Sequence, residues 1–191
     1  MAADNGYVFT YRIGVGKLVK TDADGIVQWE KSYPGGSQTD SFAVQRTSDN
    51  GYVVAGGRRS STGSGWDLWI ARTDPSGNLV WEKTFGGPGE EMGRSVRETP
   101  DGGFVVAGWS SSGGTGYDIY IVRTDSAGEL LWEKRSAVTG DDRGYDVQVT
   151  ADGGVLASGN YVEPPGAPHP GRSHAIVVKT DAPGNRPEPA I

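Results

Sequence analysis

Apolar residues fall in short runs along this chain, and the runs recur about every 50 residues. Most runs are rich in Val, Ile, Leu and aromatic residues and are bounded by Gly, Asp or Ser, which is typical of β-strands joined by tight turns. No segment has the period of about 3.6 residues that marks an amphipathic helix. The most regular copy predicts four strands, at residues 41–47, 51–57, 67–73 and 78–85.

Three short motifs keep the same period as the apolar runs. Thr-Asp begins at Thr21, Thr73, Thr124 and Thr180; Trp-Glu-Lys begins at Trp29, Trp81 and Trp132; Asp-x-Gly begins at Asp4, Asp49, Asp101 and Asp152. The motifs divide the chain into repeats at about 1–33, 34–85, 86–135 and 136–191, which we take as one domain. The first repeat lacks its first strand, and the fourth strand of the last repeat is expected near 185–191.

Four strands in a repeat of about 50 residues are the pattern of one propeller blade, so we predict an all-β β-propeller of four-stranded antiparallel blades. The second strand of each repeat agrees, since the runs that begin at Tyr52 and Phe104 are apolar on both faces. We expect about four blades, with the first and last incomplete. These partial blades overlap instead of completing one another. A four-bladed ring, a piece of a larger propeller and a ring completed by a homodimer therefore stay open.

The connections between the strands are of two kinds. Short Asp/Gly turns, such as 47–51 and 73–78, fall at one end of the predicted meander, which we call the short-turn end. Longer connections, such as 56–66, 85–94 and 159–174, differ between copies and fall at the opposite, long-loop end. Variable loops on a rigid scaffold commonly carry binding sites, so we expect a ligand at the long-loop end.

Composition and charge exclude several classes of function. The net charge of -6 and the lack of a long basic run argue against nucleic acid as a partner. No apolar stretch reaches the roughly 18 residues of a membrane span, and the first residues lack the basic and apolar parts of a signal peptide. The absence of cysteine excludes disulfides and thiol catalysis. No motif implies a cofactor or a metal.

The repeated motif Thr-Asp-x-x-Gly-x-Leu-x-Trp-Glu-Lys, together with Asp-Gly-Gly-aromatic-Val-Val-Ala-Gly, resembles a propeller repeat common in bacterial and archaeal surface proteins. The piece at 125–132 is also distantly similar to blades of quinoprotein-type propellers, but the ligand set of such enzymes is not evident, so no cofactor follows. The resemblance covers nearly the whole chain and implies a secreted or surface parent protein. It implies little about function, because such propellers have many functions.

Aromatic residues beside carboxylates are the leading candidates for a ligand-binding site. Trp66 and Tyr117 are equivalent residues of the motif Gly-x-Gly-aromatic-Asp, next to Asp67 and Asp118, and Trp109 borders the same kind of long connection. Such residues suit carbohydrate or peptide recognition. The alternative is that they anchor the loops on the blade edge.

Two other groups of residues invite a functional interpretation. The repeated Trp29, Trp81 and Trp132 could stack on sugars, but their equivalent strand positions beside Leu or Val favour packing between blades. Arg58 and Arg59 form a small basic spot that would suit an acidic partner.

Equivalent loops also carry adjacent acids, Glu90 with Glu91 and Asp141 with Asp142. Paired carboxylates can bind a hard cation or serve as acid and base in glycoside hydrolysis. Adjacency alone does not place two carboxyl groups across one bond, so we favour solvated turns over a metal or catalytic site.

The favoured hypothesis for function is a non-enzymatic binding or assembly module that uses the long-loop end, with a protein or carbohydrate ligand. The alternatives are a lectin with repeated sites and a glycoside hydrolase or lyase that uses the loop carboxylates.

Overall fold

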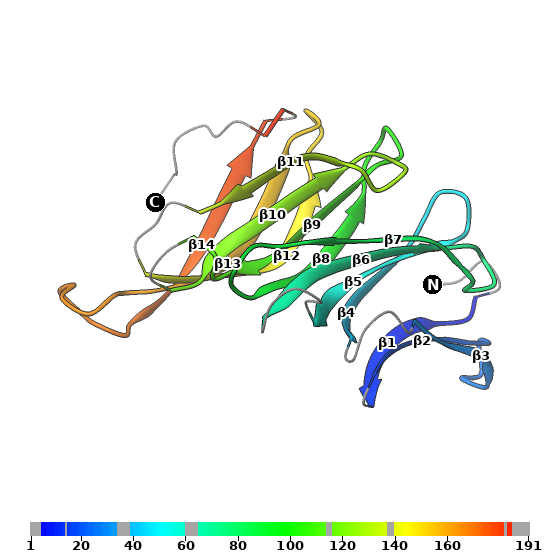
Figure 1. The fold of residues 1–191 in the computed structure, drawn as a ribbon. Helices are drawn as coiled ribbons and strands as arrows, with labels where there is room; N and C mark the ends of the chain where they lie inside the picture. Colours follow the sequence, from blue (N-terminus) through cyan, green and yellow to red (C-terminus); the bar gives the residue numbers. More distant parts are fainter. Residues whose placement is uncertain are drawn as a thin grey trace.

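The computed structural model describes residues 5–13, 15–33, 39–59, 65–113, 116–136, 140–181 and 183–184. All regular secondary structure in these residues is β-strand, arranged as four antiparallel sheets in which consecutive strands pair (Figure 1). The chain is therefore an all-β propeller of about four blades, and three strands are described in each of the first and last. Because the described residues form no helix, they include none that is long and apolar enough to cross a membrane.

The described strands follow the order of the repeats. The first sheet contains β1 (Val8–Ile13), β2 (Val15–Thr21) and β3 (Val27–Ser32), and the second contains β4 (Thr39–Arg46), β5 (Tyr52–Arg59), β6 (Trp66–Thr73) and β7 (Leu79–Phe85). The third contains β8 (Glu91–Glu98), β9 (Phe104–Ser110), β10 (Asp118–Thr124) and β11 (Leu130–Arg135), and the fourth contains β12 (Asp141–Val149), β13 (Val155–Val162) and β14 (Ser173–Thr180). The strand expected at 185–191 lies outside the described residues.

Two first strands are longer than the sequence predicts. β8 begins at Glu91 and β12 at Asp141, so the acids expected in loops lie largely inside strands. Both strands continue past a β-bulge, which shifts the register near Gly93 and near Gly144. Glycine and charged residues are uncommon in strands, and this composition hides the extensions from a pattern of apolar residues.

The sheets fan out from an inner surface formed by β4, β8 and β12. These three strands pack successively against one another and across the preceding sheet, whereas the outer strands β7 and β11 share no comparable contact. The first and fourth sheets lie at opposite ends of the row of sheets in Figure 1. Among the described strands, no backbone pairing joins these two sheets.

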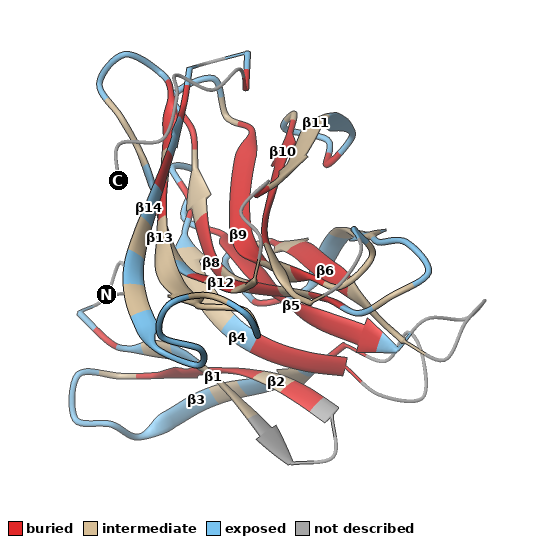
Figure 2. Ribbon diagram, turned by 90° about the vertical axis from the view of Figure 1, so that its left-hand side faces the viewer, coloured by how far each residue is buried: buried red, intermediate tan, exposed pale blue. Residues whose placement is uncertain are grey.

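A separate apolar core fills each of the three gaps between successive sheets. The middle strands β5 and β9 are buried along almost their whole length (Figure 2). The side chains of 52–55 and 104–107 are at most 2% exposed, which confirms that these strands are covered on both faces.

The repeated Trp-Glu-Lys and Thr-Asp-x-x-Gly motifs meet across the gaps. Trp81 packs edge-on against Phe104 of the next sheet, with ring centroids 5.6 Å apart. A β-carbon built on Gly128 would lie 2.8 Å from the Trp81 ring, and its φ of +81° also favours glycine. Trp29 and Gly77 repeat this arrangement one gap earlier. The tryptophans therefore pack between blades, as the sequence predicts.

Candidate ligand-binding site

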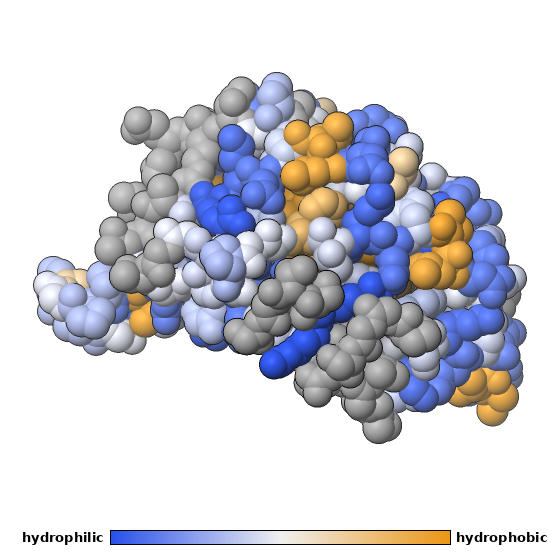
Figure 3. Space-filling model, in the orientation of Figure 1, coloured by the Kyte–Doolittle hydropathy of each residue, from blue (hydrophilic) through white to orange (hydrophobic). Residues whose placement is uncertain are grey.

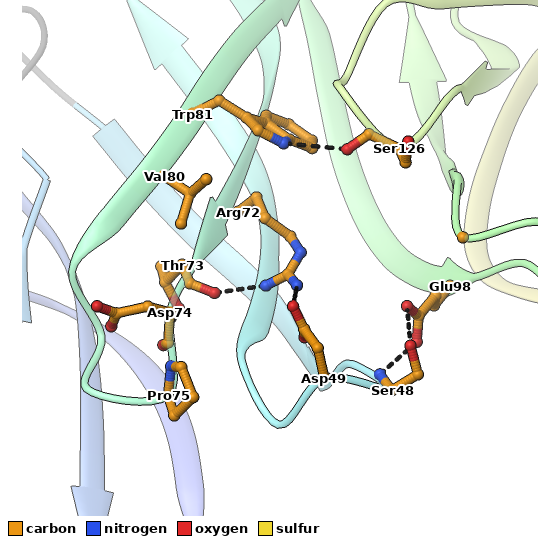
Figure 4. Close-up of a pocket in the computed structure, with 11 residues that line it drawn as sticks. Ser48, Asp49, Arg72, Thr73, Asp74, Pro75, Val80, Trp81, Glu98 and Ser126 are labelled. Atoms are coloured by element: carbon orange, nitrogen blue, oxygen red, sulfur yellow. Dashed lines mark hydrogen bonds and ion pairs between the residues drawn. The ribbon is translucent and has the colours of Figure 1, made fainter.

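Grooves at the short-turn end lie between neighbouring sheets and repeat along the molecule. One groove of about 450 Å³ lies between the second and third sheets, with Arg72 and Trp81 in its walls (Figure 4). The next gap holds a groove of about 430 Å³ with Arg123 and Trp132 in its walls. The walls are alike because equivalent residues of the repeat form them.

The charges at the short-turn end neutralise one another. Arg72 forms an ion pair with Asp49 in the first groove (Figure 4). In the second groove, Nη2 of Arg123 donates to both carboxylate oxygens of Asp101 at 2.7 Å. The hydroxyl of Thr99, followed by Arg123, lowers the pKa of Asp101 to about 2. These pairs tie neighbouring turns of one sheet together.

At the long-loop end, four of the predicted residues lie side by side in the second sheet. Arg58 and Arg59 end β5, opposite Asp67 and Trp66 of β6. Arg58 donates to the two carboxylate oxygens of Glu82 at 2.7 and 2.6 Å, and this lowers the pKa of Glu82. Arg58 is thus part of an ion pair within the sheet, while Arg59 is exposed.

The inner acid of each predicted pair anchors a loop. Glu91 is fully buried and accepts hydrogen bonds from the hydroxyls of Ser110 at 2.7 Å and Ser112 at 2.5 Å. Asp142 is also fully buried and accepts a hydrogen bond from the Ser136 hydroxyl at 2.8 Å. Buried carboxylates with such partners are typical of structural positions.

The outer acids position Tyr117. Its hydroxyl lies 3.4 Å from Oε2 of Glu90, and its backbone N–H donates to Oδ1 of Asp141 at 3.1 Å. Asp118 follows as the first residue of β10. Within the described ranges, no group of three or more His, Asp or Glu residues could hold a metal ion.

Trp109 and Tyr117 come together through two arginines that the sequence pattern does not mark as site residues. The guanidinium of Arg143 lies 4.4 Å from the ring centroid of Tyr117 and 5.7 Å from that of Trp109. The guanidinium of Arg94 lies 4.5 Å from the Trp109 centroid and 4.1 Å from that of Phe42. We call these five residues the arginine cluster. Trp66 is not one of the rings that the two arginines contact.

β-Bulges present three equivalent residues on the inner surface. The extra residue of each bulge is Phe42 in β4, Arg94 in β8 and Tyr145 in β12. A bulge re-aims its side chain relative to a regular strand. The residues Phe42 and Tyr145 are 38% and 48% exposed, and Arg94 is half-buried. Aligning the repeats would have shown that this position varies, which is the one sequence signal for it.

Charge compensation sets the arginine cluster apart. The other buried or half-buried arginines of the described residues each pair with a carboxylate: Arg58 with Glu82, Arg72 with Asp49, Arg97 with Asp146, Arg123 with Asp101 and Arg135 with Glu133. In the described part of the chain, the side chains of Arg94 and Arg143 form no hydrogen bond or ion pair, and Nε of Arg94 is buried without a partner. Burial lowers the pKa of Arg94, and the charge of Arg143 acts in the same direction, whereas Tyr145 and Asp40 act against it.

Comparison with known proteins places the fold but not the function. No family model matches the chain, and no curated protein matches it. A crystal structure of a protein of unknown function from Bacteroides caccae aligns with a TM-score of 0.54 and 13% identity, over 97% of this chain and 77% of that chain. This likeness concerns the fold alone, and in fold the chain is similar to that Bacteroides protein.

Proposed function

We propose that this chain is a non-enzymatic binding module whose ligand occupies the arginine cluster at the long-loop end. The observation that carries the proposal is the pair Arg94 and Arg143, two half-buried cations beside aromatic rings and without a carboxylate partner among the described residues. Partly desolvated charge costs free energy unless something compensates it. A ligand that supplies the compensation would account for the arrangement.

The cluster differs from the equivalent place in the preceding gap. There, Gly57 stands where the next sheet has Trp109, and Met92 stands where the fourth sheet has Arg143. A β-carbon on Gly57 would lie 2.2 Å from Sδ of Met92, so an apolar contact fills that position. One distinct site on a repeated scaffold supports a single specific ligand over a series of similar sites.

The lectin alternative draws on a different observation, the two equivalent grooves at the short-turn end. Their tryptophans pack against the next sheet and their arginines are already paired, which leaves them less to offer a sugar. The hydrolase alternative has less support, because Glu91 and Asp142 are buried beneath the loops. The likeness of the repeat to surface-protein propellers would place the binding at a cell surface.

A ligand screen with variants at both ends tests the proposal. Ligand-observed NMR would cover neutral and acidic oligosaccharides, short peptides and nucleotides, first with the unaltered protein. Each hit would then be measured with the double variant Trp109→Ala/Tyr117→Phe and with Val80→Ser in the short-turn groove as the matched control. We expect hits to weaken by roughly tenfold or more in the double variant, because it removes the Trp109 ring, whose cation–π contacts are worth about 1 kcal/mol each, together with the Tyr117 hydroxyl. Hits should be unchanged in the control.

Two outcomes would overturn the proposal. Hits that depend on Val80 and not on Trp109 would move the site to the short-turn grooves. Turnover of a hit by the unaltered protein, lost in Glu90→Gln or Asp141→Asn, would replace binding by catalysis.

A further inference from the structure

We propose that the ligand of the arginine cluster is an acidic carbohydrate, whose carboxylate lies between the guanidinium groups of Arg94 and Arg143. This inference rests on the proposed binding function and adds the chemical class of the ligand. It also assigns the two arginines as the residues that select a charged sugar over a neutral one.

Uncompensated positive charge is the first reason for an anionic ligand. Arg94 and Arg143 both lie against the Trp109 ring, at 4.5 and 5.7 Å, so two like charges share one site. The carboxylate of Asp40 acts on Arg94 through its charge, and neither arginine side chain of the cluster forms an ion pair among the described residues.

The geometry of the donors is the second reason. A guanidinium presents its N–H groups as a planar fork that matches a carboxylate, and such charge-assisted pairs are stronger than neutral hydrogen bonds. Nε of Arg94 is buried without a hydrogen-bond partner. The aromatic faces of Phe42 and Trp109 hold this guanidinium at 4.1 and 4.5 Å without consuming its donors. The guanidinium is therefore held in place, and because Nε is buried, its Nη groups are the donors that a ligand can meet.

The exposed aromatic rings are the reason to propose a sugar acid as the ligand and not a small carboxylate. The bulge residues Phe42 and Tyr145, 38% and 48% exposed, flank Arg94 on the neighbouring inner strands. A pyranose ring has an apolar face that suits such rings and hydroxyl groups that suit a phenol. A short peptide of acidic residues alone would pair with the arginines, but it has no apolar ring face to lie against the two aromatic rings.

The experiment measures affinity by titration calorimetry for four probes. They are trigalacturonate, the neutral galactose trisaccharide of the same length, triglutamate and inorganic phosphate. We expect trigalacturonate to bind, the neutral trisaccharide to bind at least tenfold more weakly, and the affinity for trigalacturonate to fall as salt is raised.

Arg94→Gln and Arg143→Gln are the test variants, and Arg46→Gln is the control. Each test variant should lose roughly tenfold to a hundredfold in affinity for trigalacturonate, the usual value of a charge-assisted hydrogen bond. Arg46 is exposed at the short-turn end of β4, so the control removes the same charge away from the cluster and should change the affinity less than twofold. Thermal unfolding of each variant verifies that it is folded.

The results separate this inference from the proposed function. Equal binding of the neutral trisaccharide, with loss in Trp109→Ala, would overturn the acidic class and leave the binding site standing. Binding of triglutamate or phosphate without trigalacturonate would overturn the sugar. No loss of trigalacturonate affinity in either Arg→Gln variant would overturn the role of the arginines, and no binding of trigalacturonate would overturn the inference outright.

Discussion

The two ends of the molecule differ in how completely their buried and half-buried arginines are paired. At the short-turn end, equivalent turns repeat the same compensated pair, Asp49 with Arg72 and Asp101 with Arg123. At the long-loop end, Arg94 and Arg143 lie half-buried on the inner surface without a carboxylate partner among the described residues. The repeats share the residues that hold turns and sheets together. They differ at the positions of the two arginines that have no carboxylate partner.

This difference follows from what each contact joins. At the short-turn end, a tryptophan of one repeat needs a glycine of the next, so a change in either disturbs the gap between two sheets. The bulge residues Phe42, Arg94 and Tyr145 occupy equivalent positions but have no shared partner that would hold their identity fixed. The scaffold therefore tolerates variation on its inner surface and resists it at the turns.

The largest expected effect compares two tryptophans. Trp81→Ala should cost about 3 kcal/mol of stability, because it removes the packing against Phe104 and Gly128 between two sheets. Trp109→Ala should cost about 1 kcal/mol, since its ring contacts two guanidinium groups and not an apolar core. Urea unfolding of both variants measures the difference, and an equal cost would show that Trp109 is also a structural residue.

The next effect compares two arginines. Arg123→Met should lose about 2 kcal/mol, because the buried guanidinium gives up its two hydrogen bonds to Asp101 and one to the carbonyl of Thr124. Arg94→Met should change stability by less than about 1 kcal/mol, since lost cation–π contacts are offset by relief of repulsion from Arg143. Chemical unfolding at neutral pH checks both. A loss at Arg94 as large as that at Arg123 would contradict the assignment of Arg94 to a ligand.

A smaller effect concerns the pH dependence of the short-turn end. Because the pKa of Asp101 in the folded protein is about 2, below its ordinary value, its ionised form stabilises the fold. That contribution is fully present above about pH 4 and is lost as the pH falls towards the folded value. Asp101→Asn should therefore unfold at a lower temperature than the unaltered protein at pH 7.

Thermal unfolding at about pH 7, 4 and 2.5 measures this comparison. The difference between the two proteins should narrow at the lowest pH, where the carboxylate of the unaltered protein takes up a proton. A difference that persists unchanged at the lowest pH would mean that the ion pair with Arg123 is not its source.

The fold was predictable because its repeated motifs encode contacts that recur in each gap. Trp81 and Gly128 mark one such contact, and the apolar second strands mark the buried middle of each sheet. The first strands were less predictable, because β8 and β12 begin with charged residues and glycine before they reach an apolar run. A pattern of apolar residues therefore detects the covered parts of a strand and misses its polar extension.

The site was predictable only in part. Trp109 and Tyr117 follow from their place beside long connections, whereas the equivalent Trp66 lies against Gly57, away from the cluster's arginines. What separates Trp66 from Tyr117 is the residue supplied by the neighbouring sheet, which only the packed structure reveals. The position of Arg94 depends in addition on the β-bulge in β8, and a single copy of the repeat gives no sign of this bulge.

The smallest expected effect concerns the exposed aliphatic residues of the short-turn end. Val80 and Leu131 occupy equivalent positions on outer strands and are 61% and 55% exposed. On the face seen in Figure 3, apolar side chains form separate patches among polar ones and not one continuous surface. Separate small patches are ordinary on protein surfaces, so Val80→Ser and Leu131→Ser should each change stability by less than about 0.5 kcal/mol.

The same two variants should leave the mass in solution and the affinity for trigalacturonate unchanged. Light scattering across a concentration series measures the mass, and urea unfolding measures the stability. A dimer that dissociates in either variant would assign the short-turn end to contact between copies of the chain. The similarity of the outer strands would then reflect contact with a second copy as well as packing between the sheets. The short-turn end would have a binding role in addition to its structural one.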